Sequence, residues 1–203
     1  METRTAIWEA SHGAGVAPAL CTEHKTACAL LLLRRPTCAT GVLALGLTFF
    51  VMAFLRFGWT PRLWYSVPLL IALAVIVVLD IRAKVIPDVV TLPGILYVLI
   101  VGALMDRLSF SSAILGAVTG GGIVFLVAVI SRGAIGGGDI KLMAMLGTAL
   151  GWKGALVVLA LSQVSAALIV LGLLIGGRLG RRDALPVGAI MSFLGAVMLL
   201  GGP

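Results

Sequence analysis

Two aspartates have sequence surroundings in which a carboxylate points to chemistry. Asp139 follows the glycines at 136–138 and precedes a short apolar stretch, and Asp80 ends the apolar run of residues 67–79. Ionisable residues at membrane depth are rare, and they mark catalytic groups or ion pathways. Two carboxyl groups that share one proton can activate water, as in aspartic proteases. On charge and position alone, a catalytic pair and a proton or cation pathway are about equally favoured.

The glycine run before Asp139 makes an ordinary continuous helix unfavourable there. Irregular backbone at membrane depth is tolerated only where it faces protein or a water-filled cavity. We therefore expect Gly136 and Gly138 to shape a loop that places Asp139 beside such a cavity, open to the cytoplasm. A structural role competes with this, because an aspartate just before a helix is also a good N-cap residue.

The composition is that of an integral membrane protein. Of 203 residues, 61% are hydrophobic and only 11% are charged, against about 25% in soluble domains, and the mean hydropathy is +1.17. The net charge of +7 comes from basic residues scattered between apolar runs. That pattern is typical of topology signals, so we expect no nucleic-acid partner.

Apolar segments of near-membrane length follow one another along the chain. They predict an all-α polytopic membrane protein with about six full transmembrane helices and one short crossing helix after the glycine loop. Pro87 should open the third helix, and no segment shows the period-2 alternation of a membrane barrel. The expected segments are residues 41–57, 63–79, 89–105, 112–131, 140–150, 155–176 and 186–200.

Lysine and arginine indicate the orientation. With the N-terminus inside and the short segment crossing, nine basic residues fall in inner loops and four in outer loops, which the positive-inside rule favours. Both aspartates then lie at the cytoplasmic end. The inner set is Arg34, Arg35, Arg82, Lys84, Arg132, Lys141, Arg178, Arg181 and Arg182, and the outer set is Arg56, Arg62, Arg107 and Lys153.

Two divisions of the chain are expected. Residues 1–40 contain a single short apolar run, too short to span a bilayer, and should form a poorly ordered cytoplasmic leader. Residues 41–203 should form the membrane domain. The three cysteines, Cys21, Cys28 and Cys38, lack the close CxxC pairs of a zinc site, so no metal is expected.

Three segments together resemble the prepilin peptidase family, the membrane aspartic peptidases with a GxGD motif. Gly136-Gly137-Gly138-Asp139, followed by Ile140-Lys141-Leu142, is similar to the family's second motif. Asp80, followed by Ile86-Pro87-Asp88, resembles the first. Leu185-Pro186-Val187-Gly188-Ala189 resembles the Pro-Phe-Gly-Pro segment that opens the last helix of many members, with Val187 and Ala189 in place of Phe and the second Pro. The resemblance covers about residues 65–200.

The resemblance implies an endopeptidase that cleaves the basic leader of type IV or Flp pilin-like precursors at the cytoplasmic face of the inner membrane. Asp80 and Asp139 would be its catalytic pair, with no metal or organic cofactor, and Gly136, Gly138 and Pro87 would shape the substrate loop. Two-domain members carry paired CxxC motifs in a region that accompanies methylation. Residues 1–40 lack them, so we expect no methyltransferase activity.

Two other classes of function remain open. A transporter that uses Asp80 and Asp139 for protons or cations would predict inverted repeats, and the sequence shows no convincing internal symmetry. A non-catalytic subunit of a pilus or secretion machine could retain the same fold. Only an activity measurement separates that reading from a peptidase.

Overall fold

The structure, a computed structural model, describes residues 33, 36–105, 109–132, 135–176 and 186–201. These residues form α-helices joined by short connections, and no strand occurs among them. The helices are α4 (Pro36–Phe57), α5 (Pro61–Ala83), α6 (Asp88–Leu104), α7 (Phe110–Ile130), α8 (Gly137–Ile175) and α9 (Val187–Gly201). The predicted all-α membrane fold is confirmed.

The helices differ in how well their lengths match a bilayer. Four of those described, α4, α5, α7 and α8, are long and apolar enough to cross a membrane. The other two, α6 and α9, have 17 and 15 residues. At 1.5 Å per residue they span about 22–25 Å of the roughly 30 Å hydrocarbon layer. The predicted six full spans therefore become four long helices and two shorter ones.

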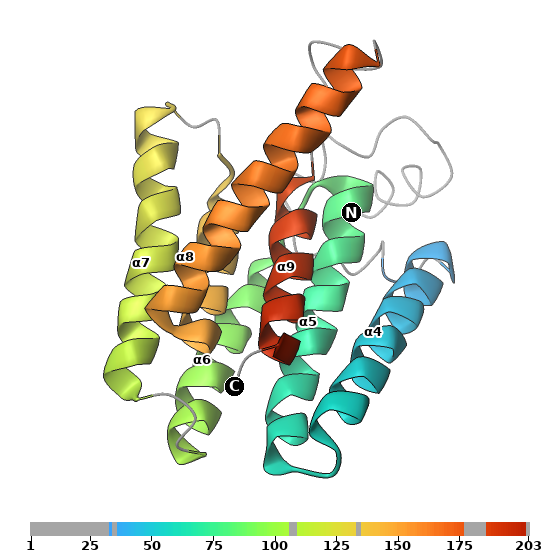
Figure 1. Ribbon diagram of the computed structural model, residues 1–203, viewed down its shortest axis with the longest axis vertical. Helices are drawn as coiled ribbons and strands as arrows, with labels where there is room; N and C mark the ends of the chain where they lie inside the picture. Colours follow the sequence, from blue (N-terminus) through green and yellow to red (C-terminus); the bar gives the residue numbers. More distant parts are fainter. Residues whose placement is uncertain (1–32, 34–35, 106–108, 133–134, 177–185, 202–203) are drawn as a thin grey trace, which may run out of the picture.

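Consecutive helices run in alternating directions through the bundle (Figure 1). As a result, α5 ends, and α6, α8 and α9 begin, at the end drawn uppermost in that view. Of the predicted leader 1–40, residues 36–40 form the start of α4, and the rest lies almost entirely outside the described residues. The antiparallel order brings the two aspartate-bearing turns to one end of the bundle, as the sequence predicts.

The short helix predicted over residues 140–150 is present as the first part of α8. Gly151 has φ 71° and ψ 175°, a backbone conformation that glycine adopts without steric cost. The chain turns sharply there, and the second part of α8 returns toward the end from which the first part came (Figure 1). The segment that carries Asp139, residues 137–150, is thus a short helix, called the short arm of α8 below. It is separate from the long helix that follows Gly151.

Glycines let α7 and the short arm of α8 pack with their backbones almost in contact. A Cβ on Gly116 would overlap the carbonyl of Gly147, and one on Gly120 would lie 2.6 Å from the Met143 carbonyl oxygen. Small residues at this spacing allow close helix approach in membranes. The α7 glycines thus lie directly against the first part of α8, and this contact fixes the segment that carries Asp139.

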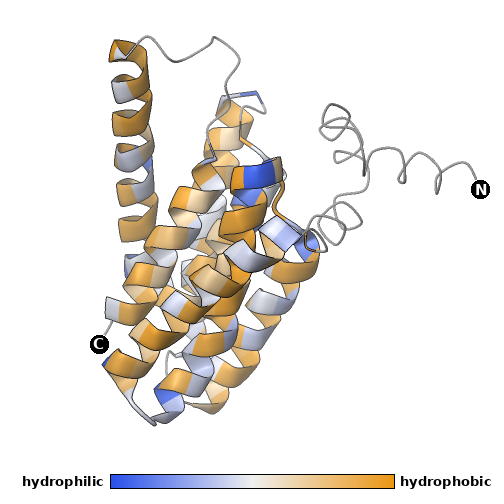
Figure 2. Ribbon diagram, turned by 90° about the vertical axis from the view of Figure 1, so that its right-hand side faces the viewer, coloured by the Kyte–Doolittle hydropathy of each residue, from blue (hydrophilic) through white to orange (hydrophobic). Residues whose placement is uncertain are grey.

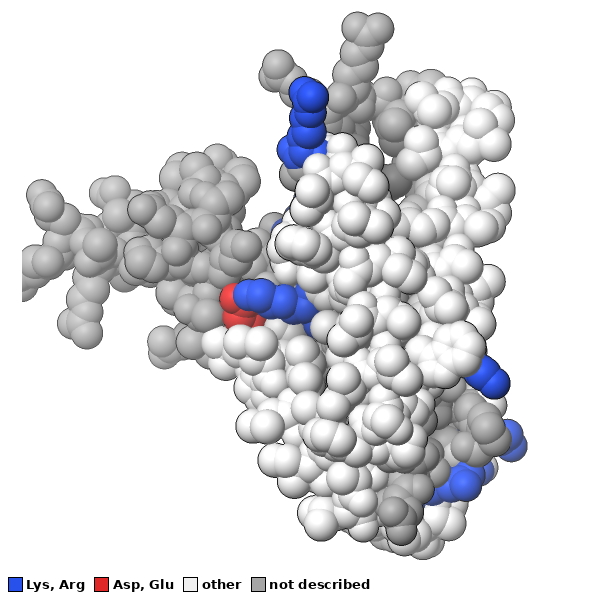
Figure 3. Space-filling model, turned by 90° about the vertical axis from the view of Figure 1, so that its left-hand side faces the viewer, with Lys and Arg blue, Asp and Glu red and all other residues white. Residues whose placement is uncertain are grey.

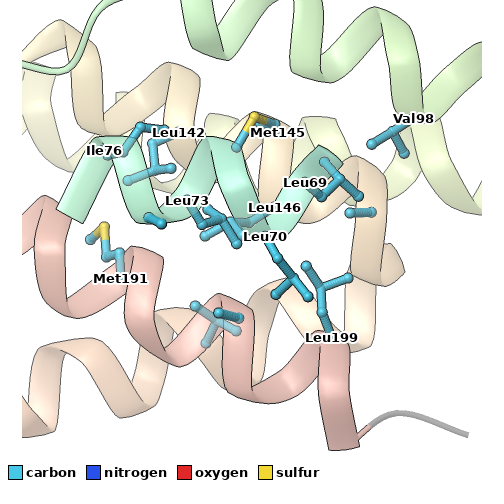
Figure 4. Close-up of a cluster of buried hydrophobic side chains, with 14 of the residues drawn as sticks. Leu69, Leu70, Leu73, Ile76, Val98, Leu142, Met145, Leu146, Met191 and Leu199 are labelled. Carbon is cyan, nitrogen blue, oxygen red and sulfur yellow. The ribbon is translucent and has the colours of Figure 1, made fainter. Parts of the chain in front are cut away.

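The interior is a cluster of aliphatic side chains and methionines between α5, α8 and α9. Figure 4 shows Leu73 and Ile76 of α5 facing Leu142 and Leu146 of α8, with Met191 of α9 beside them. All five are at most 1% exposed. The outer faces of the helices are also strongly hydrophobic (Figure 2), and charged groups lie toward the edges of the face drawn in Figure 3. Hydrophobic outer faces with charged groups toward the edges suit a lipid environment.

Candidate active site

Asp80 lies in the last turn of α5, and its surroundings are set by the bend that follows. Lys84 caps the helix with φ 52°, and its N–H donates to the carbonyl oxygen of Asp80 at 2.9 Å. A residue with a Cβ adopts this left-handed conformation at a cost of about 1–2 kcal/mol. The bend directs the next residues inward, since Ile86 and Pro87 are both buried. Asp80 itself is only 5% exposed.

Asp139 lies in the first turn of the short arm, but it is not the helix cap. The N-cap residue is Gly136, and Asp139 follows as the third helical residue, with its N–H donating to the Gly136 carbonyl at 3.1 Å. The competing interpretation of Asp139 as an N-cap residue is therefore wrong, because Gly136 occupies the N-cap position three residues earlier. Its side chain is half-buried and stays partly accessible.

One side chain of the first motif segment, Ile86, packs against both of the other two motif segments. A Cβ on Gly138 would lie 2.8 Å from Ile86 Cβ, and one on Gly188 would lie 2.7 Å from Ile86 Cδ1. Ile86 lies in the loop that follows Asp80 and α5, Gly138 precedes Asp139, and Gly188 is the second residue of α9. The three segments therefore meet around Ile86, which places the turns that carry Asp80 and Asp139 beside each other.

The first turn of α9 makes a direct contact with Asp80 that the sequence did not predict. The backbone N–H of Ala189 donates to Oδ2 of Asp80 at 2.6 Å, a buried hydrogen bond between residues 109 positions apart. The segment around Ala189 was recognised by its resemblance to a family motif, and no role in the site was assigned to it. The motif's place at the start of the last helix was the available signal.

The other charged groups of the two motifs pair with each other. Pro87 is the N-cap of α6, and Asp88 is its first residue, a position at which the helix dipole favours a carboxylate. Lys141, for which a topology role was expected, places Nζ 2.6 Å from Oδ2 of Asp88. Their side chains are 40% and 43% exposed, so solvent weakens this ion pair. It joins the start of α6 to the short arm of α8 beside the aspartate pair.

Gly136, predicted to shape the loop, has more free space for an added Cβ than Gly138 has. A Cβ there would only reach ordinary van der Waals contact with Oδ2 of Asp139, at 3.8 Å. A small hollow between α5, α6, α7 and α8 is lined by residues such as Tyr65, Phe110 and Thr148, and none of its lining residues belongs to the aspartate pair. The cytoplasmic cavity expected beside Asp139 stays a prediction.

The described residues contain no cluster of three or more His, Cys, Asp or Glu side chains that could hold a metal ion. The arrangement around Asp80 and Asp139 is thus two carboxyl groups on separate helices, one of them held by a backbone N–H. Two such groups can act on water directly, and the expectation of chemistry without a cofactor stays a prediction.

Comparison with known proteins points to the same segments. Residues 67–200 match the model of the type IV leader peptidase family. The prepilin leader peptidase/N-methyltransferase of Bacillus subtilis is 30% identical over 151 residues, 71% of this chain and 61% of that protein. The protein of that name from Burkholderia pseudomallei is 31% identical over 171 residues, 81% of this chain and 53% of the relative. No solved structure matches significantly.

The matched region includes both aspartates, the glycine run and the start of α9. The chain spans about half to three fifths of the length of these two relatives. With its apolar helices, it is a multi-pass membrane protein. The chain belongs to the type IV leader peptidase family.

Proposed function

We propose that this protein is an aspartic endopeptidase that removes the basic leader from type IV or Flp pilin-like precursors. The observation that carries the proposal is the meeting of three motif segments around Ile86, which brings together the turns that carry Asp80 and Asp139. Membership of a leader peptidase family supports cleavage of such precursors. The names of the relatives support the same substrate class.

In the proposed reaction the two carboxyl groups share one proton. The ionised carboxylate takes a proton from water as the water oxygen attacks the scissile carbonyl carbon, and the protonated group donates its proton to the carbonyl oxygen. The tetrahedral intermediate then collapses: one of its hydroxyl groups returns a proton to the ionised carboxylate, its C–N bond breaks, and the leaving nitrogen receives the proton of the protonated carboxyl group, so that the pair again holds one proton. In this proposal Gly138 and Pro87 fix the positions of the turns that carry Asp139 and Asp80, and Gly136 leaves space beside the side chain of Asp139.

The positions of basic residues support one orientation of the protein in the membrane. Arg82, Lys84, Arg132 and Lys141 lie in the described part of the chain near the helix ends that carry the aspartates. Under the positive-inside rule this supports a site at the cytoplasmic face of the inner membrane, where the basic leader of a precursor also lies. Methyl transfer, which the relatives' names include, is not part of the proposal. Its absence from this chain remains a prediction.

The test is a cleavage assay in proteoliposomes with a pilin-like precursor whose basic leader ends in glycine. Wild type is compared with Asp80→Asn, Asp139→Asn and the matched control Asp88→Asn, which removes a carboxylate at the same end of the bundle but outside the pair. We expect both pair variants to lose cleavage at least a thousandfold while they remain folded, and the control to stay within about threefold of wild type.

Two results would contradict the proposal. Full cleavage by a folded Asp80→Asn or Asp139→Asn variant would remove that aspartate from catalysis. Failure of the wild type to cleave any of several precursors would favour the non-catalytic subunit of a pilus or secretion machine.

A further inference from the structure

The turn between α4 and α5 lies at the end of the bundle opposite the aspartate pair (Figure 1). Helix α5 starts at this turn and carries Asp80 in its last turn, and its 23 residues span about 34 Å, slightly more than the hydrocarbon layer. The turn is tight, because Gly58 has a left-handed φ of 57° and its N–H donates to the Phe54 carbonyl at 2.8 Å. It therefore lies at the level of one membrane surface.

Aromatic rings form a continuous row along this turn. Phe54 contacts Trp59 edge to face, with ring centroids 5.6 Å apart, and the rings of Trp59 and Trp64 are 6.3 Å apart. Phe50, one helical turn deeper in the membrane, stacks on Phe54 at 6.5 Å. The two indoles are 77% and 60% exposed. Tryptophan suits the membrane interface because its ring is apolar while its N–H is polar, so the row leads from the lipid interior to the headgroup level.

A contact from α6 fixes the position of Trp64. Pro68 lies inside α5 and has no N–H, so the Trp64 carbonyl oxygen lacks its helical donor. The hydroxyl of Tyr97 on α6 lies 3.3 Å from that oxygen and 3.2 Å from the carbonyl oxygen of Tyr65, and it donates to them. The exposed ring of Trp64 thus projects from a backbone that a second helix holds in place.

Two exposed arginines flank the row. Arg56 lies in the last turn of α4, and Arg62 is the second residue of α5. In the described part of the chain the only acidic residues are Asp80, Asp88 and Asp139, all at the opposite end of the bundle. In the proposed orientation the turn is on the outer side, where the positive-inside rule predicts few basic residues. Topology therefore does not explain these two arginines.

We propose that the turn between α4 and α5 is a binding site for an anionic phospholipid. Arg56 and Arg62 bind the phosphate of the headgroup, since guanidinium groups match phosphate oxygens with paired N–H donors. The aromatic row receives an acyl chain along Phe54 and Phe50. A zwitterionic headgroup carries its own cation, which competes with the guanidinium groups for the phosphate, so the site prefers a lipid with net negative charge. The inference does not depend on peptidase activity.

Tryptophan fluorescence reports on this turn alone once the other tryptophans are removed. The sequence has four tryptophans, and Trp8→Phe/Trp152→Phe leaves Trp59 and Trp64. This parent variant is reconstituted in phosphatidylcholine vesicles with a rising fraction of brominated phosphatidylglycerol or brominated phosphatidylcholine, whose bromine quenches a neighbouring indole. One basic residue near an anionic surface strengthens binding about fivefold, so we expect a relative binding constant for phosphatidylglycerol of at least about five.

Two charge-matched variants of this parent test the arginines. Arg56→Gln/Arg62→Gln removes two positive charges at the turn and should lower the relative constant to about one. Arg82→Gln/Lys84→Gln removes two at the opposite end and should leave the constant unchanged. Equal quenching by the two lipids in the parent would overturn the inference, as would a preference that survives Arg56→Gln/Arg62→Gln. An equal fall in both variants would also overturn it, because the attraction would then come from the net charge of the protein.

A second measurement detects the bound lipid directly. Wild-type protein in detergent, incubated with phosphatidylglycerol, should retain the lipid in its native mass spectrum, and it should retain phosphatidylcholine less. Retention of phosphatidylglycerol should fall at least about fivefold in Arg56→Gln/Arg62→Gln but not in Arg82→Gln/Lys84→Gln. Equal retention of phosphatidylglycerol by the two variants, or none by the wild type, would reject the site.

Discussion

The most informative perturbation of the aspartate pair is a single methyl group on Gly138. The Cβ of Gly138→Ala would lie 2.8 Å from Cβ of Ile86, and ordinary contact begins at 3.4 Å. The shortfall of 0.6 Å has to be taken up by the backbone on one side or the other, because Ile86 Cβ is itself fixed to the main chain. The two turns that carry the aspartates must therefore move apart.

The size of the effect follows from two general magnitudes. Overpacking a filled interior costs about 1–3 kcal/mol, and each kcal/mol lowers Tm by about 2–4 °C for a chain of this size. A misplacement of about 1 Å at a catalytic group can lower the rate about a hundredfold. Because Asp139 is the next residue, we expect Gly138→Ala to lower Tm by several degrees and kcat by about 10- to 100-fold.

The neighbouring glycine provides a matched control. A Cβ on Gly137 would meet nothing within 4 Å, so Gly137→Ala makes the same chemical change one residue away without a clash. Alanine also favours the helical state over glycine by up to about 1 kcal/mol. We expect Gly137→Ala to keep wild-type kcat and to have an equal or slightly higher Tm. Leader cleavage in proteoliposomes and thermal unfolding in detergent measure both quantities.

Double variants separate the two contacts of Ile86. A Cβ on Gly188 would be 2.7 Å from Ile86 Cδ1, an atom that Ile86→Val removes, whereas the clash at Gly138 involves Cβ, which valine retains. Ile86→Val should therefore recover part of the stability lost in Gly188→Ala and little of that lost in Gly138→Ala. If Gly138→Ala alone behaved like Gly137→Ala in both assays, the argument that Ile86 sets the spacing of the aspartates would be refuted.

Two further predictions concern the surroundings of the pair. The ion pair of Lys141 and Asp88 is about 40% exposed on both sides and should contribute at most about 1 kcal/mol. Lys141→Met should thus lower Tm by no more than about 4 °C and keep cleavage within about threefold, and a hundredfold loss of kcat would show a role that the exposure does not explain. Gly116→Ala should destabilise strongly, because its Cβ would overlap the backbone carbonyl of Gly147, whereas Gly122→Ala has open space. Equal Tm values for these two variants would contradict the close packing of α7 on α8.

Much of the architecture could be predicted from composition and local pattern. Apolar runs of near-membrane length require helices, because backbone polar groups in lipid must pair within their own segment. The short arm before Gly151 was also predictable, since a glycine-rich loop and an eleven-residue apolar run cannot make a full span. Boundaries differed by a few residues, and α4 begins at Pro36 instead of residue 41.

The local roles of several residues could not be read from the sequence. Capping of its helix was one of the two interpretations of Asp139, but Gly136 takes that place, because a glycine run offers several equivalent starting points. The partner of Lys141 was also missed, since Asp88 lies 53 positions away in the chain. Such contacts depend on how α6 sits beside α8.

The sequence by itself determined the class of protein, the order of its helices and the two aspartates that could do chemistry. These follow from hydrophobicity, chain length and residue type, which act locally along the chain. Only the tertiary structure decided that Ile86 lies between Gly138 and Gly188 and that the N–H of Ala189 reaches Oδ2 of Asp80. Both contacts join turns that are distant in the chain, and close packing between separate helices determines where those turns meet.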